Sequence, residues 1–429
     1  MNESKAEYEL PNVRVKGEGE ITNIQHRSDR IGSNFGAYFN IIGKFQESLT
    51  DIHLQLPYSL KQGGWIGVGI MVLSAIIAIY SGHLLIRCLY YNGVNRLESY
   101  PAIGQAAFGR FGKITVQLFH YSILIGTSCI YIMLTGLNAQ SMTQQLGVDL
   151  SLKLWITIAA IIAWVPFIAL KTLREVAFLS IFGVLATVVV IVVTVVLGLL
   201  DLPRNMDKTH DAVVLSGLPV ALASISFSFG GNVIYAHVEK SMKNPEQWTK
   251  ILSLSVGTIL VMYLVLGIPG YYVYGNATTS PILDNLPTGA ALNVAKIMIT
   301  IHVIIAAPLM MTTFANEVES MLNFDQRYPS KIREFTARLG LRTLIVICVA
   351  LIAMNIPYFA DFMSLIGALS NCMIVFVLPV VFYLKLYGWR SVRIWELIWC
   401  LFIIIIGFIG CVLGAKDAIE ALKANFASK

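Results

Sequence analysis

The chain has 429 residues, of which 56% are hydrophobic and only 13% are charged, and its formal net charge is +6. Soluble domains carry about 25% charged residues, so this composition excludes an ordinary soluble enzyme and indicates a helical membrane protein. The basic residues stand between hydrophobic segments, where Lys and Arg orient a protein in the membrane. The net charge therefore does not indicate a nucleic-acid partner.

The chain opens with a polar segment, residues 1–40, that has no apolar core of signal-peptide type. We expect it to be a disordered cytosolic tail. The stretch "GKFQESLTDIHLQLPYSLKQGGW" follows at 43–65, where a first membrane span would lie. It carries four ionisable side chains within ten positions: Lys44, Glu47, Asp51 and His53. Charges near the centre of a membrane helix cost roughly 3 kcal/mol each, so this span should insert poorly on its own.

Ten further segments have the length and the scarcity of charge that are typical of membrane spans. They cover about residues 65–90, 113–142, 151–171, 175–200, 212–236, 248–275, 289–314, 337–356, 358–385 and 394–415. Several are too long for a straight perpendicular helix, which predicts tilted or broken spans. The sequence thus predicts a transmembrane domain over 41–415 and a short C-terminal tail over 416–429.

The distribution of basic residues predicts the topology. If residues 41–62 cross the membrane and the N-terminus is cytosolic, 22 of the 31 Lys and Arg residues lie in cytosolic segments. If they do not cross, the split becomes 17 against 12. Cytosolic loops carry an excess of Lys and Arg, so we predict eleven spans with the C-terminus outside. The glycosylation sequon Asn276-Ala277-Thr278 then falls on the outer or lumenal side.

The sixth of these spans contains the stretch "ASISFSFGGNVIYAHVEKSMKNPEQW", residues 223–248. Tandem glycines in a helix cost roughly 1 kcal/mol each and permit unwinding. A half-helix that begins after them would offer N–H groups and a positive dipole end to a carboxylate. The alternative is tight helix packing through small residues, and composition alone leaves both interpretations open.

Five segments resemble the amino acid/auxin permease family in order and spacing, and the match covers roughly residues 33–415. The segments are "LPYSLKQGGWIG" (56–67), "SYPAIGQAAFGRFGK" (99–113), "KTLREVAFLSIFGVLAT" (171–187), "FSFGGNVIYAHVEKSMKNPEQW" (227–248) and "GYYVYGNATTSPILDNLP" (270–287). Within this family the chain is most similar to vacuolar and vesicular amino acid transporters, including the vesicular inhibitory amino acid transporter group. The resemblance implies an all-α fold of eleven helices, arranged as the inverted repeat of the bacterial leucine transporter.

The resemblance also implies a substrate site at unwound points of spans one and six. In this chain the sixth-span residues are Ser226, Phe227, Ser228, Phe229, Gly230, Gly231 and Asn232. Thr312 and Thr313 stand where sodium-coupled relatives supply hydroxyl groups to an ion, although threonines also bond back to their own helix. His302 lies deepest in its span and is the candidate for a proton relay.

The opening stretch departs from the family. Relatives have an apolar first span interrupted by a small Gly-Thr-Gly-like break, whereas this chain has "GKFQESLTDIHLQ" between matching flanks. Three explanations are open: a mis-joined exon or retained intron in the gene model, a natural inactive or altered relative, and a charged first span that serves ion coupling. We predict that the chain as written binds and transports poorly if either of the first two holds.

The predicted function is secondary active transport of neutral amino acids across a vacuolar or other endomembrane, coupled to protons, with sodium as the alternative ion; the plasma membrane is an alternative location. A rival is an amino acid sensor or receptor that binds without net transport. The partners are then the bilayer, a small amino acid and the coupling ion. The sequence has no phosphate-loop, HExxH or GxSxG motif and no CxxC pair, so we expect neither catalysis nor a cofactor or metal.

Overall fold

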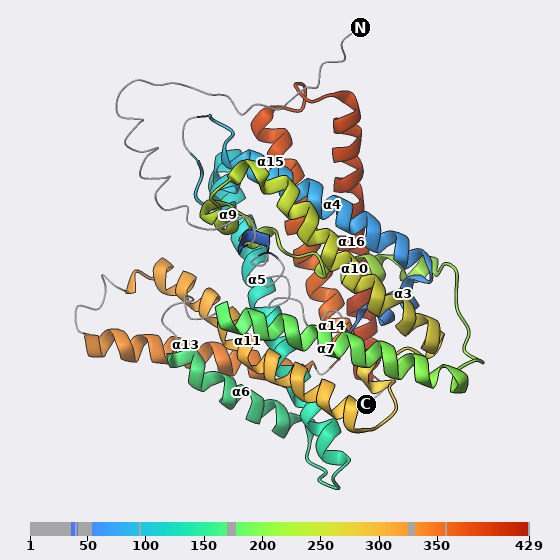
Figure 1. The fold of residues 1–429 in the computed structure, drawn as a ribbon. Coiled ribbons are helices and arrows are strands. Elements are labelled where there is room, and N and C mark those ends of the chain that lie inside the picture. Colours follow the sequence, from blue (N-terminus) through green and yellow to red (C-terminus); the bar gives the residue numbers. More distant parts are fainter. Residues whose placement is uncertain are drawn as a thin grey trace.

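The computed structural model describes residues 36–38, 41, 54–93, 96–169, 177–324, 331–356 and 358–427. This part of the chain is helical and holds ten segments that are long and apolar enough to cross a membrane (Figure 1). The ten segments coincide with the ten predicted spans. The predicted first span, 41–62, lies mostly outside the described residues, and its C-terminal end forms α3 (Leu56–Gly63). Most of the predicted N-terminal tail, residues 1–40, also lies outside them.

The remaining helices follow in chain order. They are α4 (Ile66–Leu89), α5 (Tyr100–Gln144), α6 (Leu152–Ala169), α7 (Ala177–Asp201), α8 (Leu218–Phe227), α9 (Asn232–Ser241), α10 (Trp248–Tyr274), α11 (Ala290–Met321), α13 (Lys331–Asn355), α14 (Phe359–Ile366), the π-helix η7 (Gly367–Val377), α15 (Leu378–Tyr387) and α16 (Ile394–Ala427). The 3₁₀ turns are η2 (Leu202–Arg204), η3 (Leu215–Gly217), η4 (Pro245–Gln247), η5 (Gly275–Ala277) and η6 (Ile282–Asp284).

Helix α5 begins with a separate leg before the membrane span proper. Its backbone leaves the helical region at Phe108 and Gly109, and Gly109 has a φ of 63°. Left-handed backbone of this kind favours glycine. The legs on either side of the turn touch at Gly104 and Gly112, where a Cβ on one glycine would collide with the carbonyl of the other. The segment 99–113, which precedes the predicted third span, is therefore a helical corner.

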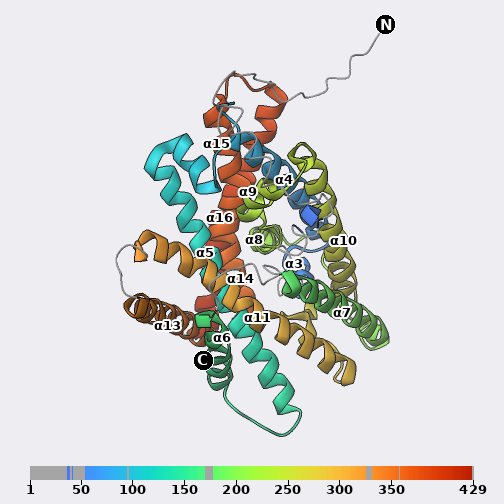
Figure 2. The same cartoon turned by 60° about the vertical axis from the view of Figure 1, so that its left-hand side comes forward.

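Helix α8 lies at the centre of the bundle. Figure 2 looks nearly along it and shows α3, α4, α10, α14 and α16 around it. It packs mainly against α3, α14, α16 and η7. The close approach depends on Gly367 of η7, because a Cβ there would overlap the carbonyl of Ala223, and on Gly414 of α16, beside the carbonyl of Pro219. Small residues thus place α8 against two later spans.

The described loops fall into two groups at opposite ends of the bundle. At one end, Tyr90 and Arg96, which follow α4, donate to the carboxylate of Glu239 in α9. The Tyr387 hydroxyl at the end of α15 donates to the carbonyl of Arg87. At the other end, the turn between α3 and α4 bonds to residues 211–212, and the amide of Asn276 donates to the carbonyl of Thr209. These described segments therefore form one group at each end of the bundle.

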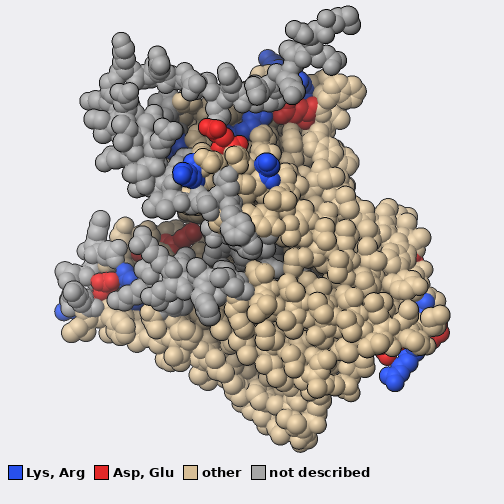
Figure 3. All heavy atoms as spheres, viewed as in Figure 1, with Lys and Arg blue, Asp and Glu red and all other residues tan. Residues whose placement is uncertain are grey.

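The lateral surface is apolar. Figure 3 shows a broad face without Lys, Arg, Asp or Glu, while these residues gather toward the ends and rims of the described structure. Helix α16 continues past the predicted end of its span at residue 415 to Ala427. The extension is held by buried Ala418 and Leu422 and by the Tyr358 hydroxyl, which donates to the carbonyl of Asn425.

Candidate functional site

The sixth span is broken at its centre. Helix α8 ends at Phe227 and α9 starts at Asn232. Between them the chain turns through tighter hydrogen bonds: the amide of Ser228 donates to Ile225, and that of Gly230 donates to Phe227. The last carbonyls of α8 and the first amides of α9 therefore meet inside the membrane domain, where helix ends carry partial negative and positive charge respectively.

The predicted sixth-span residues all lie at this break. Ser226, Ser228, Phe229 and Asn232 are 0% exposed, and Phe227 is 1% exposed. Gly231 is also buried, whereas Gly230 is partly exposed. Both interpretations of the sequence apply, because α8 packs tightly through small residues and the chain unwinds directly after it. The role of these residues in substrate binding remains a prediction.

Side chains from two other spans cap the carbonyls at the break. The side-chain amide of Asn371 in η7 donates to the carbonyl of Phe227 at 3.0 Å. The hydroxyl of Tyr263 in α10 donates to the carbonyl of Ser228 at 2.5 Å. Gly230 lies against Asn371, since a Cβ on Gly230 would be 2.6 Å from Nδ2 and 2.9 Å from Oδ1. The break is thus stabilised by specific partners.

Asn232 anchors the start of α9 to spans two and ten. Its Nδ2 lies 3.3 Å from Ser81 Oγ and 3.3 Å from each of the carbonyls of Ile374 and Val375. These carbonyls follow Asn371 by about one turn of the same helix. Asn232 and Asn371 therefore both lie where span ten crosses the break.

The first span reaches the same region through Gln55, which directly precedes α3. Its Nε2 donates to Ser224 Oγ at 3.2 Å and to the carbonyl of Ala360 at 3.2 Å, and it lies 3.4 Å from Ser364 Oγ. The two serine hydroxyls are 2.8 Å apart. Spans one, six and ten are therefore joined by uncharged polar side chains above the break.

We call this line of side chains the polar seam. It runs along the contact of span six with span ten, where Ser226 Oγ also lies 3.2 Å from Cys372 Sγ. Every member is uncharged, and together they are Gln55, Ser81, Ser224, Ser226, Ser228, Asn232, Tyr263, Ser364, Ser370, Asn371 and Cys372.

Four buried oxygens in the seam have no hydrogen-bond partner: Gln55 Oε1, Asn232 Oδ1, Ser370 Oγ and Asn371 Oδ1. A buried polar atom left unpaired costs about 1–3 kcal/mol. Native proteins pair most such groups, so each exception needs an explanation. Three of the four are amide acceptors, which require a donor from outside the described protein atoms.

The weaker predicted residues lie elsewhere, on α11. Thr312 Oγ1 donates to the carbonyl of Pro308 at 2.7 Å, and Thr313 Oγ1 donates to that of Leu309 at 3.0 Å. His302 is 3% exposed and its ring lies against Gly183 of α7. Helix α11 packs mainly on α5, α6, α7 and α13. The structure therefore does not group these residues with the break, and their roles in ion coupling remain predictions.

Two ion pairs with buried basic side chains also lie away from the break. Arg96 Nε is 2.8 Å from Glu239 Oε2 at one end of the bundle. Toward the other end, Lys296 Nζ is 3.1 Å from Asp284 Oδ1. A buried charge requires such a partner. Among the described residues, no group of three or more His, Cys, Asp or Glu side chains is placed to hold a metal ion.

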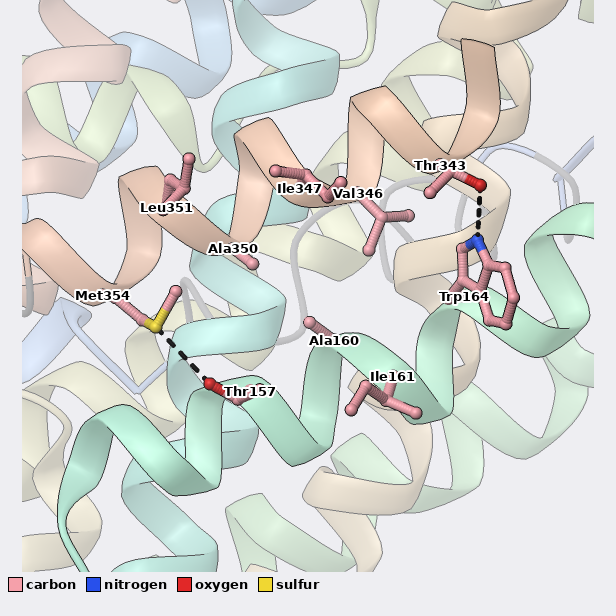
Figure 4. A pocket seen from close by; sticks show the side chains of 10 residues that line it. All are labelled: Thr157, Ala160, Ile161, Trp164, Thr343, Val346, Ile347, Ala350, Leu351 and Met354. Atoms are coloured by element: carbon pink, nitrogen blue, oxygen red, sulfur yellow. Dashed lines mark hydrogen bonds between the residues drawn. The ribbon is translucent and has the colours of Figure 1, made fainter. Parts of the chain in front are cut away.

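A pocket of about 300 Å³ lies between α6 and α13 (Figure 4). Its lining is apolar, and its few polar groups bond to each other: Trp164 Nε1 donates to Thr343 Oγ1 at 3.0 Å. Ile161, Ile347 and Leu351 of its wall are half exposed on the lateral surface. This pocket has no group that could hold the charged ends of an amino acid, and it is separate from the polar seam.

Sequence reasoning missed the partners of the break, namely Gln55, Tyr263, Ser364 and Asn371. A signal existed for Asn371, because "SNC" at 370–372 puts an amide in the middle of an apolar span. Polar side chains at such positions usually face the protein interior and mark functional sites. The apolar composition of span ten predicts a membrane helix but does not single out this residue.

The chain is similar in sequence to known plant amino acid transporters. The chain is 30% identical to amino acid transporter AVT1C of Arabidopsis thaliana over 376 residues, covering 86% of this chain and 66% of AVT1C. It is 29% identical to AVT1I of the same plant, covering 86% of this chain and 90% of AVT1I. The chain thus spans just under two thirds of the first relative's length.

The fold is also similar to a solved transporter. The inward-facing conformation of Mhp1 matches with a TM-score of 0.59 and 11% identity, over 94% of this chain and 92% of that chain. This likeness confirms the predicted all-α transporter fold. The family described as transmembrane amino acid transporter protein matches residues 32–420. The chain therefore belongs to the transmembrane amino acid transporter family.

Proposed function

We propose that this protein is a secondary active transporter that moves neutral amino acids across an endomembrane and is coupled to protons. The observation that carries the proposal is the break in span six, where two helix ends of opposite partial charge meet inside the membrane domain. A free amino acid carries a carboxylate and an ammonium group. The amide end of α9 suits the carboxylate, and the carbonyl end of α8 suits the ammonium group.

The uncharged seam supports a neutral side chain on the substrate. A charged substrate side chain in a buried site would require an opposite charge, and the seam has none. The nearest carboxylate along span ten, Asp361, accepts a hydrogen bond from Asn425 of α16 at 2.7 Å. Glu239 of α9 is paired with Arg96. Both acidic groups therefore already have partners outside the seam.

Proton coupling and location rest on further arguments. His302 is buried within a membrane helix, which is where a proton relay requires a titratable group. The endomembrane location follows from the resemblance to vacuolar and vesicular transporters.

The burial of the break sets a requirement on mechanism. Phe227, Phe229 and the capping Tyr263 are 0–1% exposed, so a substrate reaches the break only after the surrounding spans move. The amide of Ile282 in η6 donates to the carbonyl of Leu54 beside α3, so the segment before α11 is bonded to the described end of the first span. Exclusion of water strengthens the interaction of the helix ends with a zwitterion.

The test is uptake of radiolabelled amino acids by the purified chain in proteoliposomes. A panel of neutral, acidic and basic amino acids is offered with a pH gradient, with a sodium gradient and with neither. We expect accumulation of neutral amino acids that depends on the pH gradient. Protein-free liposomes and the variant Gly230→Leu are the controls. Accumulation driven by sodium alone contradicts proton coupling, and uptake confined to charged amino acids contradicts the neutral site.

The second candidate is a sensor that binds an amino acid without transporting it. The charged opening stretch favours this candidate, because it departs from the first-span sequence of relatives. The same preparation distinguishes the two, since thermal stabilisation by a neutral amino acid without any accumulation identifies a sensor.

A further inference from the structure

We propose that Asn371 is a substrate-binding residue, and that its side-chain oxygen accepts a hydrogen bond from the ammonium group of a bound amino acid. The proposal rests on the proposed function and deepens it by assigning the ammonium end of the substrate to span ten. It is carried by the orientation of the Asn371 amide, its burial without a donor, and its place beside Gly230.

The orientation of the amide is fixed by its neighbours. The carbonyl of Phe227 accepts only a donor, so the nitrogen of Asn371 must face it, at 3.0 Å. The oxygen therefore points away from that carbonyl. Asn232 is fixed in the same way, because its nitrogen faces the carbonyls of Ile374 and Val375. The two amides thus keep their oxygens free for a donor that a ligand brings.

The burial of these oxygens makes the missing donor significant. Asn371 is 1% exposed and Asn232 is 0% exposed, and neither Oδ1 has a partner. A primary ammonium group brings three donors and no acceptor. It would pair such oxygens, whereas a carboxylate would repel them.

Space and electrostatics point the same way. Gly230 is partly exposed although its neighbours in the break are buried, and its backbone packs directly against the Asn371 amide, where a Cβ would lie 2.9 Å from Oδ1. The end of α8 contributes the partial negative charge of its terminal carbonyls. A positive group beside Asn371 is therefore favoured, and the seam supplies none itself.

An inorganic monovalent cation shares this chemistry, because amide and carbonyl oxygens also ligate such ions. The experiment distinguishes the substrate's ammonium group from an inorganic cation, because only the first is lost when the ligand lacks nitrogen. The experiment measures binding by thermal unfolding of the purified full chain. The ligands are a neutral amino acid that the chain accumulates or binds, the matching carboxylic acid without nitrogen, its N,N-dimethyl form, and sodium chloride against choline chloride.

We expect the wild type to bind the amino acid and to discriminate against both analogues. In Asn371→Leu the amino acid should bind about ten- to hundredfold more weakly, as expected for a lost hydrogen bond to a charged group, while the acid without nitrogen binds as it does to the wild type. Asn138→Leu is the matched control, because Asn138 is a buried asparagine of α5 that bonds to Thr300 at 3.0 Å. It should keep the discrimination.

Asn371→Asp provides a second variant of nearly equal volume, which keeps an acceptor and should retain the preference for the amino acid. Equal affinity of Asn371→Leu and wild type for the amino acid would overturn the proposal. So would sodium stabilisation that Asn371→Leu abolishes while amino acid affinity is unchanged, which would show an inorganic cation site. Equal wild-type affinity for the acid without nitrogen overturns it without any variant. A wild type that no amino acid stabilises overturns the proposed function itself, and with it this assignment.

Discussion

Gly230→Ala tests the contact between the broken span six and span ten. The added Cβ would lie 2.6 Å from Asn371 Nδ2 and 3.1 Å from Cγ, so the amide must move away from the carbonyl of Phe227. The lost hydrogen bond contributes about 1 kcal/mol. The Phe227 carbonyl keeps the amide of Gly230 as a donor at 3.2 Å, which holds the cost near that value. The φ of Gly230 is not positive, so alanine brings no backbone strain.

The effect on transport follows from this displacement. A loss of about 1 kcal/mol in substrate binding raises KM roughly fivefold. A larger side chain fills the space altogether, so Gly230→Leu and Gly231→Leu should abolish uptake while the protein still folds and reaches its membrane. Gly257→Ala is the control for Gly230→Ala, because a Cβ on Gly257 of α10 meets no atom within 4 Å. Proteoliposome uptake gives KM, and thermal unfolding of the purified protein gives Tm.

A double substitution identifies the contact responsible. If Gly230→Ala acts by pushing on Asn371, the Tm loss that it causes should largely disappear in an Asn371→Ala background, because contacting residues are not additive. An unchanged loss in that background would show that the methyl group acts elsewhere. Wild-type Tm and KM in Gly230→Ala and in the Leu variants would refute the placement of the site at the break.

Other predictions follow from the remaining groups. Asp284→Asn should destabilise the protein by about 1 kcal/mol, because it removes the half-exposed counter-charge of buried Lys296 while the hydroxyl of Ser141 still accepts from the ammonium group; adding Lys296→Met should recover most of the lost Tm. His302→Gln should remove the dependence of uptake on a pH gradient while exchange persists, and unchanged dependence excludes this relay. A tag after residue 5 should face the cytosol and Asn276 the other side; finding both on one side would show that residues 41–62 do not cross. Replacing residues 43–55 by an apolar segment with one Gly-Thr-Gly break should raise uptake. Strong gradient-driven uptake by the unaltered chain would contradict both a gene-model error and an inactive relative.

The spans were predictable because a bilayer imposes a length and an apolar composition on any helix that crosses it. The break was predictable because Gly230 and Gly231 are poor helix formers within a serine-rich segment. The last turns of α16 were not, because residues after 415 carry charges, and their helix depends on contacts with Tyr358 from another span.

The partners of the break depend on three-dimensional packing. Asn371 is one polar residue in an apolar segment, and the surrounding sequence does not indicate that it faces Phe227, 144 residues away. The π-helix of span ten is likewise set by its neighbours, since it packs on α8 at Gly367, where a side chain would overlap Ala223. Such wide turns occur often at functional sites.

The seam also bears on the charged opening stretch. Gln55, at the end of the first span, is joined to Ser224 and Ser364, so the described end of that span is seated against spans six and ten. The sixth-span half of the proposed site has a broken helix, capped carbonyls and unpaired acceptors. If residues 43–55 lack the amides that relatives supply, a substrate would be held by its ammonium end and lose partners for its carboxylate. Binding would then weaken but keep its dependence on the substrate's nitrogen, whereas coupled transport, which needs both spans to close on the substrate, would fail. Affinity that falls in Asn371→Leu, together with uptake that rises only when 43–55 is replaced, would separate the two halves of the site experimentally.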